Sequence, residues 1–136
     1  MISLIYVSMA SEGVAPEDVR ELAEHSAQRN AEIRVTGLLA FNSSRFMQLL
    51  EGEESAVIAT MERISQDSRH HDVNILRKAD TRQRECPGWS MRALMGPLTG
   101  EGSASEFTAS LPEKMEVDTR ILFTSFASAL RDQLEP

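Results

Sequence analysis

The sequence predicts an α+β protein with the element order β-α-β-β-α-β-β, followed by two further helical segments. Three observations predict this class. Short runs rich in β-branched and aromatic residues alternate with segments of helical periodicity. One helical segment follows the first strand directly, and the other follows a hairpin. The chain has 136 residues, close to the commonest size of a single domain.

Composition and charge limit the classes of function. Hydrophobic residues make up 41% of the chain and charged residues 26%, as in ordinary soluble globular proteins. No apolar segment is long enough to cross a bilayer, so we expect no membrane partner. The formal net charge of -7 argues against nucleic acid, whose phosphates require a clustered basic face. We therefore expect protein or small-molecule partners.

The cysteine content and the N-terminal residues predict the compartment. Cys86 is the single cysteine, so the chain forms no internal disulfide and no multi-cysteine zinc site. Met1 is followed by strand-forming residues, without a basic leader or a small-residue cleavage site. These features predict a cytoplasmic protein.

The first strand and the first helix are predicted within residues 2–29. Residues 2–7 (ISLIYV) are rich in β-formers and predict a strand. Pro16 at the first helical position, followed by two acids, predicts a helix that continues to about Arg29. The inward face of this helix is predicted to carry three apolar residues and then two polar ones: Val19, Leu22, Ala23, Ser26 and Asn30.

A hairpin, a second helix and two more strands complete the predicted sheet. Residues 35–41 (VTGLLAF) and 46–50 (FMQLL) flank a turn-forming segment and predict a hairpin. The second helix is expected from about Gly52 to Asp67, with an apolar stripe on one side. The last two strands are predicted at residues 73–76 and 89–95.

This order predicts a ferredoxin-like sandwich with an additional strand and two helices on one sheet face. We expect residues 1–96 to form this domain and residues 97–136 to form a C-terminal helical appendage, with a linker around residues 100–103. The last helix, residues 118–134, carries a predicted apolar stripe of Ile121, Leu122, Phe126, Ala129 and Leu130. We expect it to pack on the open sheet face, with an output or dimer surface as the alternative.

Two uncharged polar side chains are predicted to point into the apolar interior. Tyr6 shares a strand face with Leu4, and Gln48 shares one with Phe46 and Leu50. A buried amide that loses a hydrogen bond costs about 1–3 kcal/mol, so Gln48 needs partners, and Tyr6 is one candidate. With Ser26 and Asn30 they would surround an apolar pocket suited to a planar heteroaromatic ligand. Each of these residues alone is more commonly an ordinary core residue.

Asp67, Arg69 and His70 lie where the second helix is expected to end. Cations at such a place commonly do no more than bind the last carbonyls of the helix. A zinc site formed by His70 and His71 is disfavoured, because adjacent residues rarely converge on one ion and no third ligand is evident.

Six sequence blocks together resemble the BLUF family, sensors of blue light using FAD. The resemblance covers residues 1–96, and the spacing between the blocks agrees with the family pattern without an insertion. The blocks are Tyr6-Val7-Ser8, Ser26 with Asn30, residues 35–39 (VTGLL), residues 46–52 (FMQLLEG), residues 67–70 (DSRH) and Trp89-Ser90-Met91. The ordered set is specific, whereas any single block would be weak.

The resemblance implies a non-covalently bound flavin between the two helices, usually FAD, with FMN and riboflavin as alternatives. Tyr6 and Gln48 would be the photoactive pair. The residues implied to bind the cofactor are Ser26, Asn30, Gln48, Asp67, Arg69 and His70. Two positions depart from the family pattern: Cys86, where phenylalanine is frequent, and Arg29, where asparagine or histidine is common. We expect these departures to tune flavin binding.

The implied mechanism is light-driven transfer of an electron and a proton from Tyr6, which leaves the Gln48 amide rotated or tautomerised. Trp89 or Met91 would contact Gln48 and carry the change to the output. Residues 97–136 are too few for an independent enzyme domain, so we expect a sensor and no enzyme. Its output would pass to a separate partner protein or through a homo-oligomer.

Three alternatives stay open at this point. Arg69 and Asn30 could hold a phosphate in an acylphosphatase-like hydrolase of ferredoxin-like fold. Cys86 could form a flavin adduct as in LOV photoreceptors, although its surroundings (RECPGW) do not resemble their motif. The helical tail alone favours a dimeric interaction module without a cofactor.

Overall fold

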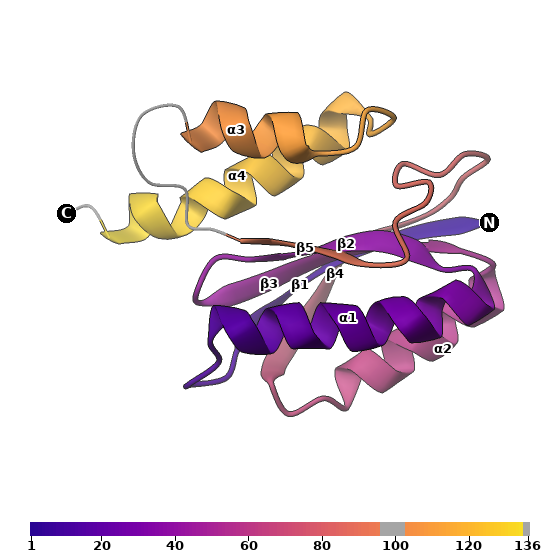
Figure 1. Ribbon diagram of the computed structural model, residues 1–136, viewed down its shortest axis with the longest axis horizontal. Helices are drawn as coiled ribbons and strands as arrows, with labels where there is room; N and C mark the ends of the chain where they lie inside the picture. Colours follow the sequence, from indigo (N-terminus) through magenta and orange to yellow (C-terminus); the bar gives the residue numbers. More distant parts are fainter. Residues whose placement is uncertain (96–102, 135–136) are drawn as a thin grey trace.

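The computed structural model describes residues 1–95 and 103–134, with side chains described for residues 1–95 and 106–128. One five-stranded sheet lies between two layers of helices (Figure 1). The elements are β1 (Ile2–Ala10), α1 (Pro16–Ile33), β2 (Thr36–Phe41), β3 (Arg45–Gly52), α2 (Glu54–Ser65), β4 (His70–Asp80), β5 (Arg92–Met95), α3 (Ser103–Ser110) and α4 (Val117–Leu134).

The strand order β4-β1-β3-β2-β5 confirms the ferredoxin-like sandwich with an added strand. β1 pairs with both β3 and β4 in antiparallel orientation, so it lies inside the sheet. β2 is antiparallel to β3 and parallel to β5. Gly37 permits the close approach of β2 to β3, because a Cβ atom there would lie 1.8 Å from the carbonyl oxygen of Leu49.

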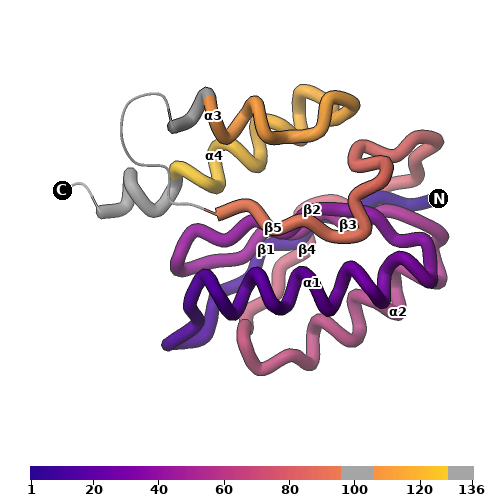
Figure 2. The backbone as a smooth tube through the Cα atoms, in the orientation of Figure 1, coloured from indigo at the N-terminus to yellow at the C-terminus, as the bar shows by residue number. Residues whose placement is uncertain are grey.

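Helices α1 and α2 cover one face of the sheet, as predicted (Figure 2). Pro16 begins α1, and the Asp18 carboxylate accepts the backbone N–H of Ala15 at 2.9 Å. Val19 and Ala23 are buried against the sheet, and Asn30 is buried on the same side of the helix. The apolar periodicity of α1 therefore carries a polar side chain into the layer between helix and sheet.

Helices α3 and α4 cover the opposite face of the sheet (Figure 2). Phe107, Phe123 and Phe126 pack with sheet residues Ile5 and Leu49 in one core. The expected docking on the open sheet face is thus what the structure has. The linker around residues 100–103 and the side chains of Ala129 and Leu130 fall partly or wholly outside the described residues.

At the start of α4, the residues that face the sheet differ from the predicted apolar stripe. Ile121 is 60% exposed, whereas Thr119 and Phe123 are fully buried. The side of α4 that faces the sheet carries Phe123 and Phe126. On the same side Arg77 of β4 donates to the Thr119 hydroxyl at 3.0 Å, a tertiary contact that hydrophobic periodicity does not contain.

Several predicted boundaries are too short or misplaced. β1 extends to Ala10, α1 extends to Ile33, and α2 ends at Ser65, before Asp67. β4 covers eleven residues, whereas the sequence predicts only residues 73–76. It is an edge strand with mostly exposed polar residues, and these conceal strand character in the sequence.

The last strand is shorter than predicted, because β5 begins only at Arg92. Trp89 and Met91 therefore precede this strand instead of lying on it. A turn at Pro87-Gly88, where Gly88 has φ 82° and the Trp89 N–H donates to the Cys86 carbonyl at 3.1 Å, is followed by a bend at Ser90. This bend keeps residues 89–91 out of the strand.

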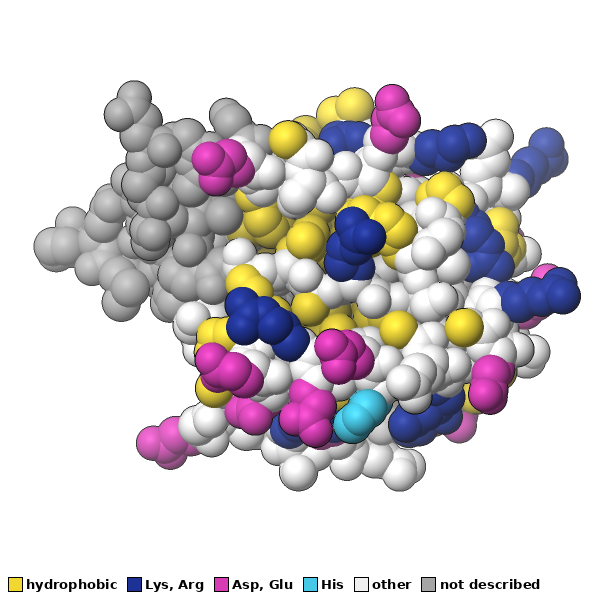
Figure 3. All heavy atoms as spheres, in the orientation of Figure 1, with side chains coloured by type: hydrophobic (Ala, Val, Ile, Leu, Met, Phe, Trp, Pro, Cys, Tyr) yellow, Lys and Arg dark blue, Asp and Glu magenta, His cyan; other side chains and the backbone are white. Residues whose placement is uncertain are grey.

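Basic and acidic side chains are interspersed over the face shown in Figure 3. Within the part of the chain that the structure describes, no helix is long and apolar enough to span a membrane.

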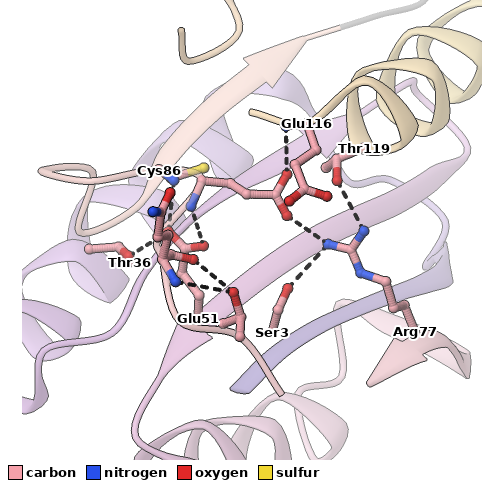
Figure 4. A network of polar contacts seen from close by, with 10 residues as sticks. Ser3, Thr36, Glu51, Arg77, Cys86, Glu116 and Thr119 are labelled. Carbon is pink, nitrogen blue, oxygen red and sulfur yellow. Dashed lines mark hydrogen bonds and ion pairs between the residues drawn. The ribbon is translucent and has the colours of Figure 1, made fainter. Parts of the chain in front are cut away.

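A buried polar network fastens the segment between β4 and β5 to the sheet and to α4 (Figure 4). The Glu51 carboxylate is fully buried and accepts the backbone N–H groups of Glu85 at 2.8 Å and Cys86 at 2.7 Å. Thr36 donates its hydroxyl to the same carboxylate at 2.8 Å. Three donors thus satisfy a charge that would otherwise be costly to bury.

An ion pair continues this network towards α4. Arg77 pairs with Glu85 at 2.9 Å and also donates to the hydroxyls of Ser3 and Thr119. The second oxygen of Glu85 accepts the backbone N–H of Glu116, just before α4 begins, at 3.2 Å. One side chain of the β4–β5 segment therefore joins an edge strand to the start of α4.

Replacing Glu51 by glutamine should destabilise the fold by about 1–3 kcal/mol, because the amide would turn a donor towards a backbone N–H and leave it without an acceptor. Denaturant unfolding measures this loss. Glu54→Gln, at an exposed position of α2, is the matched control and should change the free energy of unfolding little. Equal effects of the two substitutions would show that Glu51 does not hold the β4–β5 segment.

Candidate functional site

Tyr6 and Gln48 lie directly opposite each other on β1 and β3. The Tyr6 hydroxyl donates to Gln48 Oε1 at 2.5 Å, and the two residues are 2% and 5% exposed. Opposed residues of an antiparallel pair project to the same sheet face, so the pairing register itself produces this contact. The partner predicted for Gln48 is the one that the structure has.

The other end of the Gln48 amide contacts Met91. Gln48 Nε2 donates to Met91 Sδ at 3.3 Å. Trp89 packs against the core on the opposite sheet face, with the Arg92 guanidinium 4.1 Å from its ring centre. Of the two residues predicted as output contacts, the structure therefore brings Met91 to Gln48 and places Trp89 on the side of α3 and α4.

Asn30 extends from α1 to the same segment. It is 2% exposed, and its Nδ2 donates to the backbone carbonyl of Ser90 at 2.9 Å. No described residue donates to its Oδ1 atom, which keeps acceptor capacity. Ser26, one turn earlier on α1, lines the cavity beside it.

Asp67 and Arg69 form a bidentate ion pair in the turn between α2 and β4. Arg69 Nη2 lies 2.6 Å from Asp67 Oδ2, and Arg69 Nε donates to Asp67 Oδ1 at 2.9 Å. Hydrogen bonds from Arg69 hold the pKa of Asp67 below its usual value. The Arg69 side chain thus pairs with Asp67 at the rim of the site, whereas a cation at the end of a helix commonly binds the last carbonyls.

His70 is held by the protein at both ring nitrogens. Nε2 donates to the Ile64 carbonyl oxygen at 2.6 Å, and Nδ1 lies at hydrogen-bond distance, 2.7 Å, from the Ser8 hydroxyl. Its ring lies 6.1 Å from those of Tyr6 and Phe46. His70, which the resemblance implies as a cofactor-binding residue, is therefore a wall of the site with both ring nitrogens already bound by the protein.

Two adjoining cavities open between α1 and α2. An inner cavity is bounded by the sheet and an outer one by the helices, and both are lined by Leu22, Ser26, Gln48, Ile64, Asp67 and Arg69. The inner cavity adds Tyr6, Leu39, Phe46 and His70. The outer cavity adds His25, Arg29, Asn30, Thr60 and Arg63. The predicted site residues Tyr6, Ser26, Asn30, Gln48, Asp67, Arg69 and His70 thus all line this pair of cavities.

Sequence reasoning missed two contributors. Ser8 lies two residues after Tyr6 and so faces the same side of β1, and period-two alternation could have identified it as the partner of His70. Ser90 takes part through its backbone carbonyl, for which no side-chain pattern exists. Of the arginines that line the outer cavity, Arg63 was also not predicted, and Arg29 was named only as a departure from the family pattern that tunes flavin binding.

Cys86 lies away from these cavities. It is fully buried in the core shared with α3 and α4, and burial raises the pKa of its thiol. A thiol buried on the other side of the sheet does not reach a ligand between α1 and α2, so the LOV alternative is wrong on geometry.

The family model described as "Sensors of blue-light using FAD" (BLUF) matches residues 1–92. The chain belongs to this family. It is therefore a flavin-binding photosensory protein. The phenol of Tyr6, the carboxamide of Gln48 and the thioether of Met91, joined beside the cavity, are interpreted below as part of this function. The hydrolase alternative finds no support, and the charge of Arg69 is taken up by Asp67.

Curated relatives of the chain are longer, light-regulated proteins. The photoactivated adenylate cyclase subunit beta of Euglena gracilis is 30% identical over 129 residues, which are 94% of this chain and 14% of that protein. The blue light- and temperature-regulated antirepressor BluF of Escherichia coli is 37% identical over 73 residues, which are 54% of this chain and 18% of that protein. The chain thus spans less than a fifth of these relatives.

Solved structures match the whole fold. Klebsiella pneumoniae BlrP1 in a complex with manganese and cyclic diGMP has a TM-score of 0.82 at 28% identity, over 99% of this chain and 34% of that chain. The BlrP1 BLUF structure has a TM-score of 0.77 at 30% identity, over 93% of this chain and 89% of that chain. The first match extends over α3 and α4 as well as the sheet.

The cavity fits a flavin ring by its own chemistry. Its lining combines the apolar side chains of Leu22, Leu39 and Ile64 with the amides of Asn30 and Gln48, which keep unused hydrogen-bonding capacity. Within the described ranges, no group of three or more potential metal ligands of the His, Cys, Asp or Glu type comes together.

Tyr6 should resist ionisation in the native protein, because burial raises the pKa of its phenol and the charge of Asp67 raises it further. The unfolded chain ionises near pH 10, so it holds fewer protons than the native state above that pH. The contribution of Tyr6 to the free energy of unfolding is therefore fully present below about pH 10. Above that pH it falls by at most about 1.4 kcal/mol per pH unit.

The measurement is the free energy of unfolding between about pH 9 and pH 11 for the natural chain and for Tyr6→Phe. Because Tyr6 is the only tyrosine, the tyrosinate absorption band reports on it alone and should appear only on unfolding. A tyrosinate band in the folded protein at about pH 10, or identical pH profiles for the two proteins, would contradict the assignment.

Proposed function

We propose that this chain senses blue light through a hydrogen-bond chain from Tyr6 through Gln48 to Met91, beside a non-covalently bound FAD. The observation that carries the proposal is the pair of contacts on one carboxamide, Tyr6 to Oε1 and Nε2 to Met91 Sδ. A single side chain thus joins the phenol to the segment that leads into β5.

Tyr6 is suited to give up an electron and a proton together. The bound flavin supplies a ring that absorbs blue light and accepts an electron when excited. Because the Tyr6 hydroxyl already donates to Gln48 Oε1 at 2.5 Å, its proton has a short path to the amide as the electron leaves. Burial disfavours a free tyrosinate, so the proton moves with the electron. Both return to Tyr6 on recombination, so Tyr6 undergoes no net oxidation and only the arrangement of the Gln48 amide has changed.

Gln48 is suited to record the event. A carboxamide both donates and accepts, so rotation of its side chain exchanges the two ends between Tyr6 and Met91. Tautomerisation leaves the ends in place and exchanges their donor and acceptor roles. The hydrogen bond to Met91 Sδ is weak and easily given up. The two arrangements therefore differ in contacts, which a light-driven shift between two states requires.

The output would leave through the segment that contains Met91. Glu51 holds this segment from the far side of β3, and the Arg77–Glu85 ion pair ties it to the start of α4. A change at Met91 would thus reach the α3 and α4 layer, with Trp89 packed against it. The appendage of residues 97–136 would present the result to a separate protein or to a second copy of the chain.

Ring binding is assigned to the predicted set. Asn30 and Arg69 would hydrogen-bond the carbonyl edge of the ring, Asp67 would orient Arg69, and Ser26 would line the pocket. His70 would pack as a wall. FAD is the cofactor in the family description, and the proposed place of action is the cytoplasm, where a lone buried thiol stays reduced.

Tyr6→Phe should bind flavin but show no light-induced shift of the flavin absorption band, because the proton and electron donor is lost. Gln48→Leu should also abolish the shift while Tyr6 remains. Absorption spectra before and after blue illumination measure both, and flavin content per chain is the control. A complete photocycle in Tyr6→Phe would refute the donor role.

Asn30→Ala should weaken flavin binding by about tenfold or more, since a buried amide that bonds both Ser90 and the ring edge contributes about 1–3 kcal/mol. Asn74→Ala, at an exposed position of β4, is the matched control and should leave affinity unchanged. Titration of flavin-free protein, followed by flavin fluorescence, gives both constants. Equal affinities for the two variants would remove Asn30 from the site.

A further inference from the structure

The outer cavity between α1 and α2 has cationic walls on both sides. His25 and Arg29 lie one turn apart on α1, and Arg63 lies on α2 together with Thr60. This cavity shares part of its lining with the inner one, including Gln48 at the bottom and Ser26 on α1. A ligand whose ring occupied the inner cavity would extend outwards between these two walls.

The charges of Arg29 and Arg63 are not neutralised by the part of the chain that the structure describes. Neither side chain makes a hydrogen bond or an ion pair with any described residue. Arg69, Arg77 and Arg84 contrast with them, since each is held by carboxylates, hydroxyls or carbonyl oxygens. Exposed arginines are often unpaired, but these two line one cavity from opposite helices.

The arginines also repel each other. Burial lowers the pKa of Arg63, and the positive charge of Arg29 lowers it further. The acid in the same cavity, Asp67, is already paired with Arg69 and cannot neutralise them. An anion between α1 and α2 would relieve this repulsion and would meet two planar guanidinium groups, the side chains best matched to phosphate oxygens.

We propose that Arg29 and Arg63 form a phosphate-binding site for the side chain of a phosphorylated flavin, FMN or FAD, whose ring lies in the inner cavity. The proposal rests on the proposed flavin function. A flavin carries its phosphate at the end of a short polyol chain, and the hydroxyls of Ser26 and Thr60 line the passage between the two cavities and the arginines. Riboflavin, which lacks the phosphate, would forgo this contact.

The comparisons agree with a phosphorylated ligand. The family description names FAD, and one Klebsiella pneumoniae BlrP1 structure, 28% identical to this chain, is described with FMN. Both flavins carry a phosphate on the same polyol chain. FMN and FAD therefore both present a phosphate at the same distance along the chain from the ring.

The test is titration of flavin-free protein with riboflavin, FMN and FAD at low and high salt, for the natural chain and for the double variant Arg29→Gln, Arg63→Gln. The natural chain should bind FMN at least about tenfold more tightly than riboflavin at low salt, with a smaller preference at high salt. The double variant should bind FMN no more tightly than riboflavin, with its riboflavin affinity unchanged.

Arg20→Gln is the matched control, because Arg20 is an exposed arginine of α1 that does not line either cavity. It should keep the full preference for FMN. The FAD titration separates the phosphates: an equal loss for FMN and FAD in the double variant places the contact at the phosphate next to the polyol. A loss for FAD alone would overturn that shared site.

Failure of this inference differs from failure of the proposed function. If riboflavin bound the natural chain as tightly as FMN, the phosphate site would be wrong and the flavin sensor would stand. The phosphate site would also be wrong if Arg20→Gln removed the preference as effectively as the double variant. If none of the three flavins bound, both proposals would fall.

Discussion

The hydrogen bond between Tyr6 and Gln48 is a product of sheet register, and the rest of the site depends on it. β1 and β3 are paired so that these two residues oppose each other and project to the same face. A shift of one residue would turn one of the two side chains to the other face of the sheet. The apolar neighbours on each strand oppose such a shift, because it would take Leu4 or Leu50 out of the core beneath α1 and α2 and turn polar Ser3 or Glu51 into it. The core thereby holds the photoactive pair in place.

Strand β3 serves both faces of the sheet through its alternation. Gln48 points to the cavity beneath α1 and α2, and Glu51 points to the layer of α3 and α4. Both side chains reach the segment between β4 and β5, Gln48 through Met91 and Glu51 through the backbone of Glu85 and Cys86. This segment is therefore held from both sides of the sheet. If the Gln48–Met91 hydrogen bond on the cavity side is lost, the contacts of Glu51 on the other side still hold the segment.

The local patterns of the sequence predicted most of the fold and the centre of the site. Period-two alternation placed Tyr6 and Gln48 on inward faces, and the period of α1 placed Ser26 and Asn30 on its inner side. The length of β4 could not be predicted, because an edge strand buries few residues. The choice of Met91 over Trp89 depended on the bend at Ser90 between them, since residues two apart on a regular strand would share a face. Glu51 and Arg77 needed tertiary partners that no local pattern contains.

The central claim is that illumination of the flavin-loaded protein leaves a rearranged hydrogen-bond chain through Gln48, with no lasting covalent change. The most direct measurement is the absorption spectrum of the natural, flavin-loaded chain before blue illumination, directly after it and during dark recovery. The account predicts a reversible shift of the blue band to longer wavelength with its intensity largely retained. Bleaching of that band, as a thiol adduct would give, or an unchanged spectrum of the loaded protein would contradict the account.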